Sequence, residues 1–134
     1  DKDFIQNPLP QRVYPWGDEF DLNKTNNRDT GIGATSAVGC FAKGVSPYGL
    51  HDLSGNVWEW GRSLYEKYPY PERGKELSER ENLAAGDSTS RVLRGGAFSV
   101  TSSAVRCAAR GGGGPSGRGR NLGFRVVVVP RSSS

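Results

Sequence analysis

The chain is 134 residues long, a length that predicts one domain. A hydrophobic content of 34%, together with 19 glycines and 8 prolines, favours a loop-rich fold with little regular secondary structure. No apolar run approaches the roughly 20 residues that a membrane-spanning helix needs, so no membrane span is predicted.

Turn-forming residues dominate the first third of the chain. Residues 1–12 are predicted to be a poorly ordered leading segment, and the domain is predicted to occupy residues 13–134. Residues 13–35 are rich in asparagine, aspartate and glycine, which predicts a long loop with local hydrogen bonds. Residues 56–60 alternate polar and apolar side chains and fit a short strand.

The second half offers one helix candidate and two strands. Residues 66–82 favour a helix, but two prolines and a glycine limit it to a short piece. Residues 91–98 and 123–129 are rich in Val, Leu and Phe and are predicted to be the last two strands of the core. The second of these strands would bury Phe124 and the run of valines that follows it.

A recurring frame runs through residues 93–129. It consists of Leu-Arg-Gly-Gly at 93–96, Arg-Cys-Ala at 106–108, Leu-Gly-Phe-Arg-Val at 122–126, and the single residues Arg110, Pro115 and Arg118. Small or polar residues fill the places between, including four consecutive glycines at 111–114. Glycine costs more backbone entropy than any other residue, so folding does not explain this run.

We interpret the places between the frame residues as variable positions, where the fold tolerates almost any side chain and which together form an exposed ligand-binding face. The alternative is an ordinary low-complexity Gly/Ser loop without function. The variable positions are Phe98, Ser99, Val100, Thr101, Ser103, Ala104, Ala109, Gly111, Gly112, Gly113, Gly114, Ser116, Gly117, Gly119, Arg120 and Asn121.

Three upstream motifs and the frame carry a family resemblance. The motifs are Tyr-Pro-Trp-Gly-Asp at 14–18, Ser-Pro-Tyr-Gly-Leu at 46–50 and Asp-Leu-Ser-Gly-Asn-Val-Trp-Glu-Trp at 52–60. With the frame they resemble the formylglycine-generating enzyme (sulfatase-modifying factor) family over nearly the whole chain. The resemblance implies an α+β, C-type-lectin-like fold of the formylglycine-generating-enzyme type, loop-rich with few short strands.

Domains of that family usually carry a longer N-terminal region, with a first strand and two helices, ahead of the Trp-Gly-Asp motif. The resemblance leaves three alternatives for this chain. It is a fragment truncated at its N-terminus, or a partner segment or chain completes the fold, or the fold is a reduced version.

The catalytic thiols of the family are not matched. Family oxidases use two cysteines just after the Arg-Gly-Gly turn, where this chain has Val100 and then the slightly shortened stretch 101–104. Cys107 matches a family cysteine that is not catalytic. A thiolate is needed to bind copper or to attack a substrate, so we predict that the chain is not an enzyme.

The residues at the variable positions resemble those of variable proteins of diversity-generating retroelements, in which adenines are randomised, mostly within Asn codons. Such randomisation cannot produce Lys, Glu, Gln, Met or Trp, and none of these occurs in residues 97–125. The resemblance implies a hypervariable region at about 94–126 that binds a protein ligand. The alternative is a non-catalytic or divergent oxidase domain of the formylglycine-generating-enzyme type.

The family also binds calcium, through residues that match Asp52, Gly55, Val57 and Glu59 here, so the resemblance implies a structural calcium ion. Calcium takes about 6–8 oxygen ligands, which include carboxylates and backbone carbonyls. In the alternative, Asp52 caps the turn and Glu59 pairs with an arginine.

Charge, cysteine and histidine content point to no further activity. The net charge is +4, and residues 97–125 hold five arginines and no acidic residue, but most of these arginines match frame positions, so nucleic-acid binding is not predicted. Cys40 and Cys107 form either a disulfide or two buried free thiols, and we expect the thiols. His51 is the one histidine and is expected to be structural.

Two other groups of residues have competing interpretations. Asn26, Asn27 and Asp29 resemble the surroundings of another family calcium site, but their altered spacing favours a solvated loop. Trp16, Trp58 and Trp60 could line a sugar site, whereas in the family the Trp-Glu-Trp element belongs to the core, and we expect the core.

Overall fold

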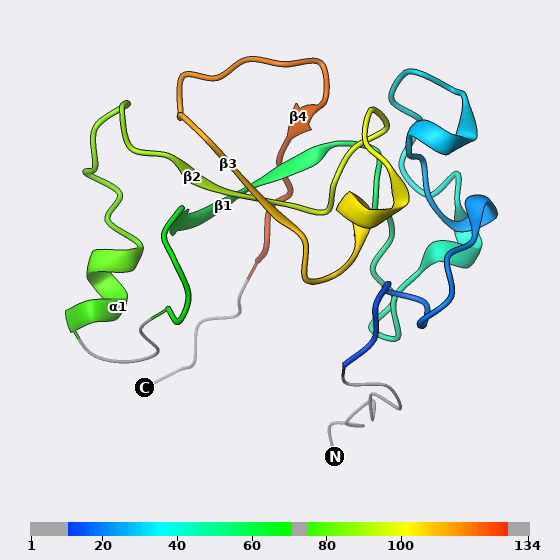
Figure 1. Ribbon diagram of the computed structural model, residues 1–134, viewed down its shortest axis with the longest axis horizontal. Coiled ribbons are helices and arrows are strands. Elements are labelled where there is room, and N and C mark those ends of the chain that lie inside the picture. Colours follow the sequence, from blue (N-terminus) through cyan, green and yellow to red (C-terminus); the bar gives the residue numbers. More distant parts are fainter. Residues whose placement is uncertain (1–10, 71–74, 129–134) are drawn as a thin grey trace.

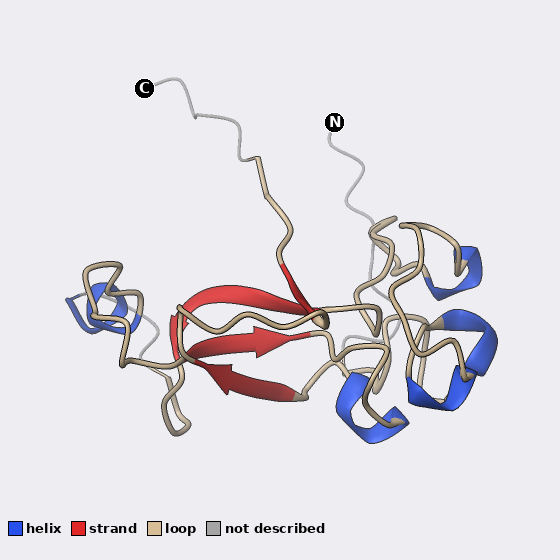
Figure 2. Cartoon of the chain, turned by 90° about the horizontal axis from the view of Figure 1, so that it is seen from above, coloured by secondary structure: helices blue, strands red, loops and turns tan. Residues whose placement is uncertain are grey.

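The computed structural model describes residues 11–70 and 75–128, in which the regular elements are short and widely spaced. The sheet lies in the middle, with α1 at one end and the 3-10 helices at the other (Figures 1 and 2). In chain order the elements are η1 (Leu22–Lys24), η2 (Arg28–Thr30), η3 (Ala42–Gly44), β1 (Trp58–Leu64), α1 (Lys75–Arg80), β2 (Arg91–Arg94), η4 (Ser102–Val105), β3 (Arg110–Gly113) and β4 (Leu122–Gly123). None of the described helices is long and apolar enough to cross a membrane.

Four strands form one mixed sheet in the order β3-β2-β1-β4. The three longer strands are antiparallel, with Leu93 of β2 opposite both Trp60 of β1 and Gly111 of β3. β4 is parallel to β1 and pairs with it through only two residues, Leu122 and Gly123. The sheet therefore brings the end of the variable segment beside the Trp-Glu-Trp motif.

The apolar core is small and lies where the sheet meets the surrounding loops. Val105 and Ala97 have no exposed surface, and Phe98 retains only 2%. The buried hydrophobic residues are Tyr14, Leu64, Val92, Leu93, Ala97, Phe98 and Val105.

Polar residues are almost as numerous in the interior, and most of them gather around the turn at residues 54–56. The Thr25 hydroxyl donates to the carbonyl of Ser54 at 2.7 Å, and the Ser54 hydroxyl donates to the carbonyl of Val105 at 2.5 Å. The side chains of Asn26 and Asn56 bond to the loop at residues 34–36. Buried polar groups must be hydrogen-bonded to be tolerated, and these bonds hold three distant segments together.

The backbone of this buried turn adopts conformations that favour glycine and asparagine. Gly55 has φ of 81° and Asn56 has φ of 65°. Gly55 donates its N–H to the carbonyl of Gly95, and the carbonyl of Asn56 accepts from the N–H of Phe98. The turn is thereby bonded directly to the Arg-Gly-Gly segment that opens the variable region.

The predicted last core strand is wrong in extent and in burial. Pairing with β1 stops at Gly123, and Phe124, Val126, Val127 and Val128 are 75 to 89% exposed. The described chain after β4 leads away from the sheet, so no second layer covers these side chains (Figure 2). Apolar character predicted burial, but burial requires a neighbouring element. The last residue of that prediction, Val129, lies outside the described part of the chain.

The other element predictions hold with shifted boundaries. The helix expected within residues 66–82 is the single short α1. The strand expected at 91–98 stops at Arg94, because Gly95 and Gly96 turn the chain with φ of 88° and 73°. Residues 13–35 form the expected loop, but it is not solvated at Asn26 and Asn27, which are 1% and 0% exposed.

Gly55→Ala should destabilise the fold strongly. A β-carbon there would lie 2.3 Å from both the Asn26 carbonyl oxygen and the Thr25 hydroxyl oxygen, in a backbone conformation that disfavours alanine. Gly33→Ala is the matched control, because Gly33 has φ of 68° and nothing within 4 Å of an added β-carbon. In thermal melts we expect the control to lose about 1 to 2 kcal/mol and Gly55→Ala to lose at least about 2 kcal/mol more. Equal losses would contradict the close packing of this turn.

Candidate ligand-binding face

The variable segment runs from β2 through η4 and β3, and then through the loop at the top of Figure 1 to β4 at the opposite edge of the sheet. Phe98 is buried, so the prediction that it belongs to an exposed face is wrong. The half-buried variable positions are Ser99, Val100, Ala104, Ala109, Gly111, Gly113, Gly114 and Asn121. The exposed ones are Thr101, Ser103, Gly112, Ser116, Gly117, Gly119 and Arg120.

The two ends of the variable segment meet in space. The side-chain amide of Asn121 donates to the Ser99 hydroxyl at 3.0 Å, across 22 residues of chain. The guanidinium of Arg120 lies 5.8 Å from the ring centroid of Phe98, on the outer side of this core residue. Variable positions that are distant in sequence therefore share one surface at this end of the sheet.

The glycines of β3 divide between the two faces of the sheet, because successive strand residues point to opposite sides. A β-carbon at Gly111 or Gly113 would face the rings of Trp58 and Trp60, at 3.9 and 3.0 Å respectively. A β-carbon at Gly112 would instead meet the ring of Tyr65 at 2.5 Å. The expectation of a single face thus fails for Gly112.

The glycine run does not depend on glycine's backbone freedom. None of the residues 111–114 has a φ in the left-handed region, and Gly111 to Gly113 form a regular strand. A β-carbon at Gly111 would make ordinary contacts of 3.7 to 3.9 Å with Leu93 and Trp58. Trp58 and Trp60 are only half-buried beside these glycines, so the expected core burial is incomplete.

Frame arginines bind backbone carbonyls, as expected for structural residues. Arg94 donates to the carbonyls of Ala108 and Ala109 at 3.2 and 3.1 Å, which bridges β2 to the start of β3. Arg106 donates to the carbonyl of Ser103 at 2.8 Å. Arg118 lies exposed on the loop after β3.

Arg125 connects the C-terminal end of the frame to the Asp-Leu-Ser-Gly-Asn motif. It binds both carboxylate oxygens of Glu59, at 2.6 and 2.5 Å, and donates to the carbonyls of His51 and Asp52, each at 3.0 Å. The hydrogen bond that Arg125 donates to Glu59 raises the pKa of Arg125. Asp52 accepts from the N–H of Gly39 at 2.7 Å. Bidentate arginine–carboxylate pairs are strong and geometrically specific.

The calcium donor set does not fit an ion as it is arranged here. Both oxygens of Glu59 face the guanidinium of Arg125, and Asp52 caps a turn. The pairing of Glu59 with an arginine is the alternative considered above, whereas Asp52 binds the N–H of Gly39 in another loop rather than the turn of its own motif. Within the described residues, no group of three or more His, Cys, Asp or Glu is placed to hold a metal ion. Calcium binding stays a prediction, and it requires Arg125 to release Glu59.

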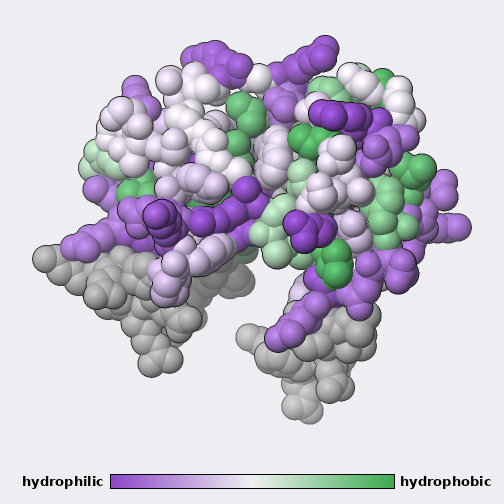
Figure 3. Space-filling view, viewed as in Figure 1, coloured by the Kyte–Doolittle hydropathy of each residue, from purple (hydrophilic) through white to green (hydrophobic). Residues whose placement is uncertain are grey.

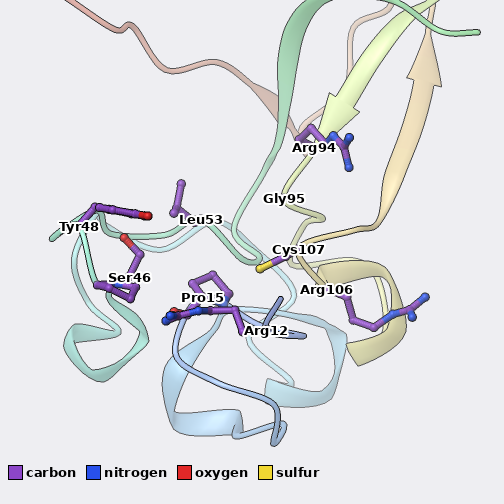
Figure 4. Close-up of a pocket in the computed structure, with 10 residues that line it drawn as sticks. Arg12, Pro15, Ser46, Tyr48, Leu53, Arg94, Gly95, Arg106 and Cys107 are labelled. Carbon is purple, nitrogen blue, oxygen red and sulfur yellow. The ribbon is translucent and has the colours of Figure 1, made fainter. Parts of the chain in front are cut away.

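Cys40 and Cys107 are free thiols, as expected, but both are exposed rather than buried. The Cys107 sulfur points into an apolar pocket of about 380 Å³, beside Pro15 and Leu53 (Figure 4). Partial burial raises the pKa of Cys107, and the charge of Arg12 only partly opposes this. A thiol held in its protonated form is a poor nucleophile and a poor metal ligand.

Buried and exposed variable positions should differ sharply in their response to mutation. Phe98→Ala removes a ring with 2% exposure and should cost about 3 to 5 kcal/mol. Ser116→Tyr changes an exposed loop residue and should alter stability by less than about 0.5 kcal/mol. Thermal melts measure both. Similar melts for the two variants would show that the variable segment does not separate into core and surface as described.

Calcium and Arg125 should compete for Glu59. An ion that binds only the folded chain adds about 2.7 kcal/mol at a hundredfold excess over its Kd. If the site exists, calcium should raise the melting temperature relative to chelator, more in Arg125→Ala than in the wild type, and not in Glu59→Gln. If calcium changes the melting temperature of none of the three proteins, Glu59 serves only to bind Arg125 and there is no calcium site.

Comparison with known proteins places these features in a family. The profile of the sulfatase-modifying factor enzyme 1-like domain matches residues 9–130. The "Inactive C-alpha-formylglycine-generating enzyme 2" of Bos taurus is 33% identical over 89% of this chain and 38% of its own length. The Bos taurus "Formylglycine-generating enzyme" is 29% identical over 90% of this chain and 34% of its own length.

A solved structure shares the fold. "Treponema denticola variable protein 1" superposes with a TM-score of 0.61 and 26% identity, over 76% of this chain and 34% of that chain. The chain therefore spans about two fifths or less of these relatives. The expected loop-rich, C-type-lectin-like architecture of the formylglycine-generating-enzyme type is confirmed. The chain belongs to the sulfatase-modifying factor enzyme 1-like domain family.

Proposed function

We propose that the chain is a ligand-binding variable protein, whose frame holds the backbone while the variable positions recognise a partner and are diversified by a retroelement. The observation that carries the proposal is a division of roles along one segment. Arg94, Arg106 and Arg125 fasten the backbone through hydrogen bonds. The glycines at 111–114 have no left-handed backbone conformation, and Gly111 and Gly114 have room for a first side-chain carbon.

The surface around this segment suits a protein partner. On the face seen in Figure 3, hydrophobic residues are scattered among hydrophilic ones and form no continuous patch. Serine and glycine residues add adaptable hydrogen bonds to an interface at little steric cost. The similarity to a protein named a variable protein supports the same class of function.

This chain lacks the two cysteine thiols that the oxidases of the family use for catalysis. Val100 occupies the place of the first family thiol, and its carbonyl accepts a hydrogen bond from the N–H of Arg28. The two cysteines of the sequence are unpaired and lie outside that place, and the pKa of Cys107 is raised. We therefore propose a non-catalytic role, which agrees with the similarity to a relative described as inactive.

This copy should bind its partner weakly through the variable positions alone. Binding energy at interfaces is concentrated in Trp, Tyr and Arg side chains. Among the variable positions only Arg120 belongs to that set. Aromatic side chains at exposed positions such as Thr101 or Ser116 would supply the binding energy that the present small residues do not provide.

Two display libraries of the whole chain test the proposal. The first randomises exposed variable positions, and the second randomises the same number of frame positions. The first library's positions are Thr101, Ser103, Ser116, Gly119 and Arg120, and the second's are Arg94, Gly96, Arg106, Leu122 and Arg125. We expect most members of the first library to stay folded and to yield binders against a panel of purified proteins, and most members of the second to be lost.

Natural copies provide an independent check. Genomic DNA beside the coding region should hold a reverse-transcriptase gene and a near-repeat of the segment for residues 93–129, differing at adenines. Sibling copies that are invariant at the variable positions would instead support a non-catalytic accessory domain. Equal survival of the two libraries would contradict the division between frame and variable positions.

A further inference from the structure

Three tyrosines surround Arg110 on the side of the sheet that Gly112 faces. The guanidinium carbon of Arg110 lies 4.7, 4.1 and 5.2 Å from the ring centroids of Tyr65, Tyr68 and Tyr70. Tyr68 and Tyr70 meet edge to face at 5.0 Å. With Arg94, which donates to the Tyr68 hydroxyl at 2.8 Å, these residues form what we call the tyrosine–arginine cluster.

Hydrogen bonds hold the cluster in one arrangement. The Tyr70 hydroxyl accepts from Arg110 at 2.5 Å and donates to the carbonyl of Leu64 at 2.9 Å. Arg94 is fixed by the carbonyls of Ala108 and Ala109, as described above. A partner that binds here would meet side chains that are already ordered, which lowers the entropy cost of association.

The cluster is open to solvent. Tyr65 is 43% exposed and Tyr68 is 57% exposed. Tyr65 lies against the bare backbone of Gly112, where a side chain would collide with its ring. The glycine at this variable position thus allows an aromatic residue from outside the variable segment to occupy the surface.

No carboxylate of the described residues balances the charges of Arg94 and Arg110. Within the described residues, the ion pairs of the arginines are made by Arg62, Arg80 and Arg125, with Glu81 and Glu59. Among the described residues, Arg94 and Arg110 bind tyrosine hydroxyls, tyrosine rings and backbone carbonyls. Two ordered guanidinium groups beside each other on exposed aromatic rings favour an anionic ligand.

We propose that the tyrosine–arginine cluster binds an acidic segment of a partner protein, whose Asp or Glu carboxylates pair with Arg94 and Arg110 while its chain packs on Tyr65 and Tyr68. The proposal rests on the proposed protein-binding function and locates its strongest contacts. Tyrosine and arginine are the residues in which interface energy concentrates.

Nucleic acid fits this surface less well. A polyphosphate chain needs a stripe of positive charge along its path. Here Glu66 belongs to the same loop as the tyrosines, and its N–H is bonded to the Tyr70 hydroxyl. Glu81 adds a second carboxylate, paired with Arg80, whose guanidinium carbon lies 5.7 Å from the ring centroid of Tyr70. A short acidic peptide can place its charges at the two arginines alone.

Isothermal titration with three defined probes tests the proposal on the full chain. The probes are a capped hexapeptide of alternating Asp and Glu, its neutral counterpart of Asn and Gln, and a dodecamer of thymidylate. We expect the acidic peptide to bind at least tenfold more tightly than the neutral one, with affinity that falls as salt screens the charges.

Matched variants separate the cluster from the rest of the surface. Arg110→Gln and Tyr68→Ser should each weaken binding of the acidic peptide at least fivefold. Arg118→Gln removes an exposed arginine elsewhere, and Tyr48→Ser removes a tyrosine that is also 57% exposed, so neither should change it. Thermal melts show whether each variant remains folded. Tyr68→Phe keeps the ring, so if both Tyr68 variants melt like the wild type and only Tyr68→Ser binds weakly, the loss reflects the missing ring rather than unfolding.

The outcomes are distinct. No binding of the acidic peptide by the wild type, equal affinity for the neutral peptide, or equal loss in the control variants would overturn the proposal. Tighter binding of the thymidylate, lost in the same variants, would overturn it in favour of a nucleic-acid surface. None of these results affects the library test of the variable positions, so failure of the cluster and failure of the proposed function are distinguishable.

Discussion

The fold depends on a buried turn whose hydrogen bonds run in three directions. The N–H of Asn56 donates to the carbonyl of Asn26 in the N-terminal loop, and the N–H of Gly55 donates to the carbonyl of Gly95 in the Arg-Gly-Gly segment. The Ser54 hydroxyl donates to the carbonyl of Val105 in η4. Each of these groups would lose its water on burial, so each requires its partner. A domain with a small apolar core is thus given its specific shape by polar contacts, because such contacts are directional and hydrophobic burial is not.

This arrangement separates the stability of the domain from the identity of the variable residues. The turn and the frame arginines bind the variable segment through its backbone, which is the same for every amino acid except proline and glycine. Most variable side chains then take no part in holding the chain. Three positions are exceptions: Phe98 fills the core, Gly112 leaves room for Tyr65, and the Asn121 side chain is hydrogen-bonded to Ser99.

Sequence reasoning predicted the family, the loop-rich architecture and the short helix, because motifs and turn residues act locally. It predicted wrongly where the outcome depends on a distant neighbour. Phe124 reads as a core aromatic, yet it is exposed because β4 leaves β1 after two residues. Asn26 reads as a solvated loop residue, yet the turn at Gly55 covers it. The tyrosine–arginine cluster was not predicted, because its members are far apart in sequence. The tyrosines at 65–70 precede α1, whereas Arg94 and Arg110 follow it.

The unstrained backbone of the glycine strand has a practical consequence for measuring recognition. Interfaces are usually dissected by truncating side chains, and each truncation leaves behind unpaired groups or cavities that blur its meaning. At Gly111 and Gly114 this copy starts from the truncated state, with room for a first carbon. Side chains can therefore be added at these positions one at a time, and the contribution of each is measured as the gain in binding affinity over the present glycine-bearing chain.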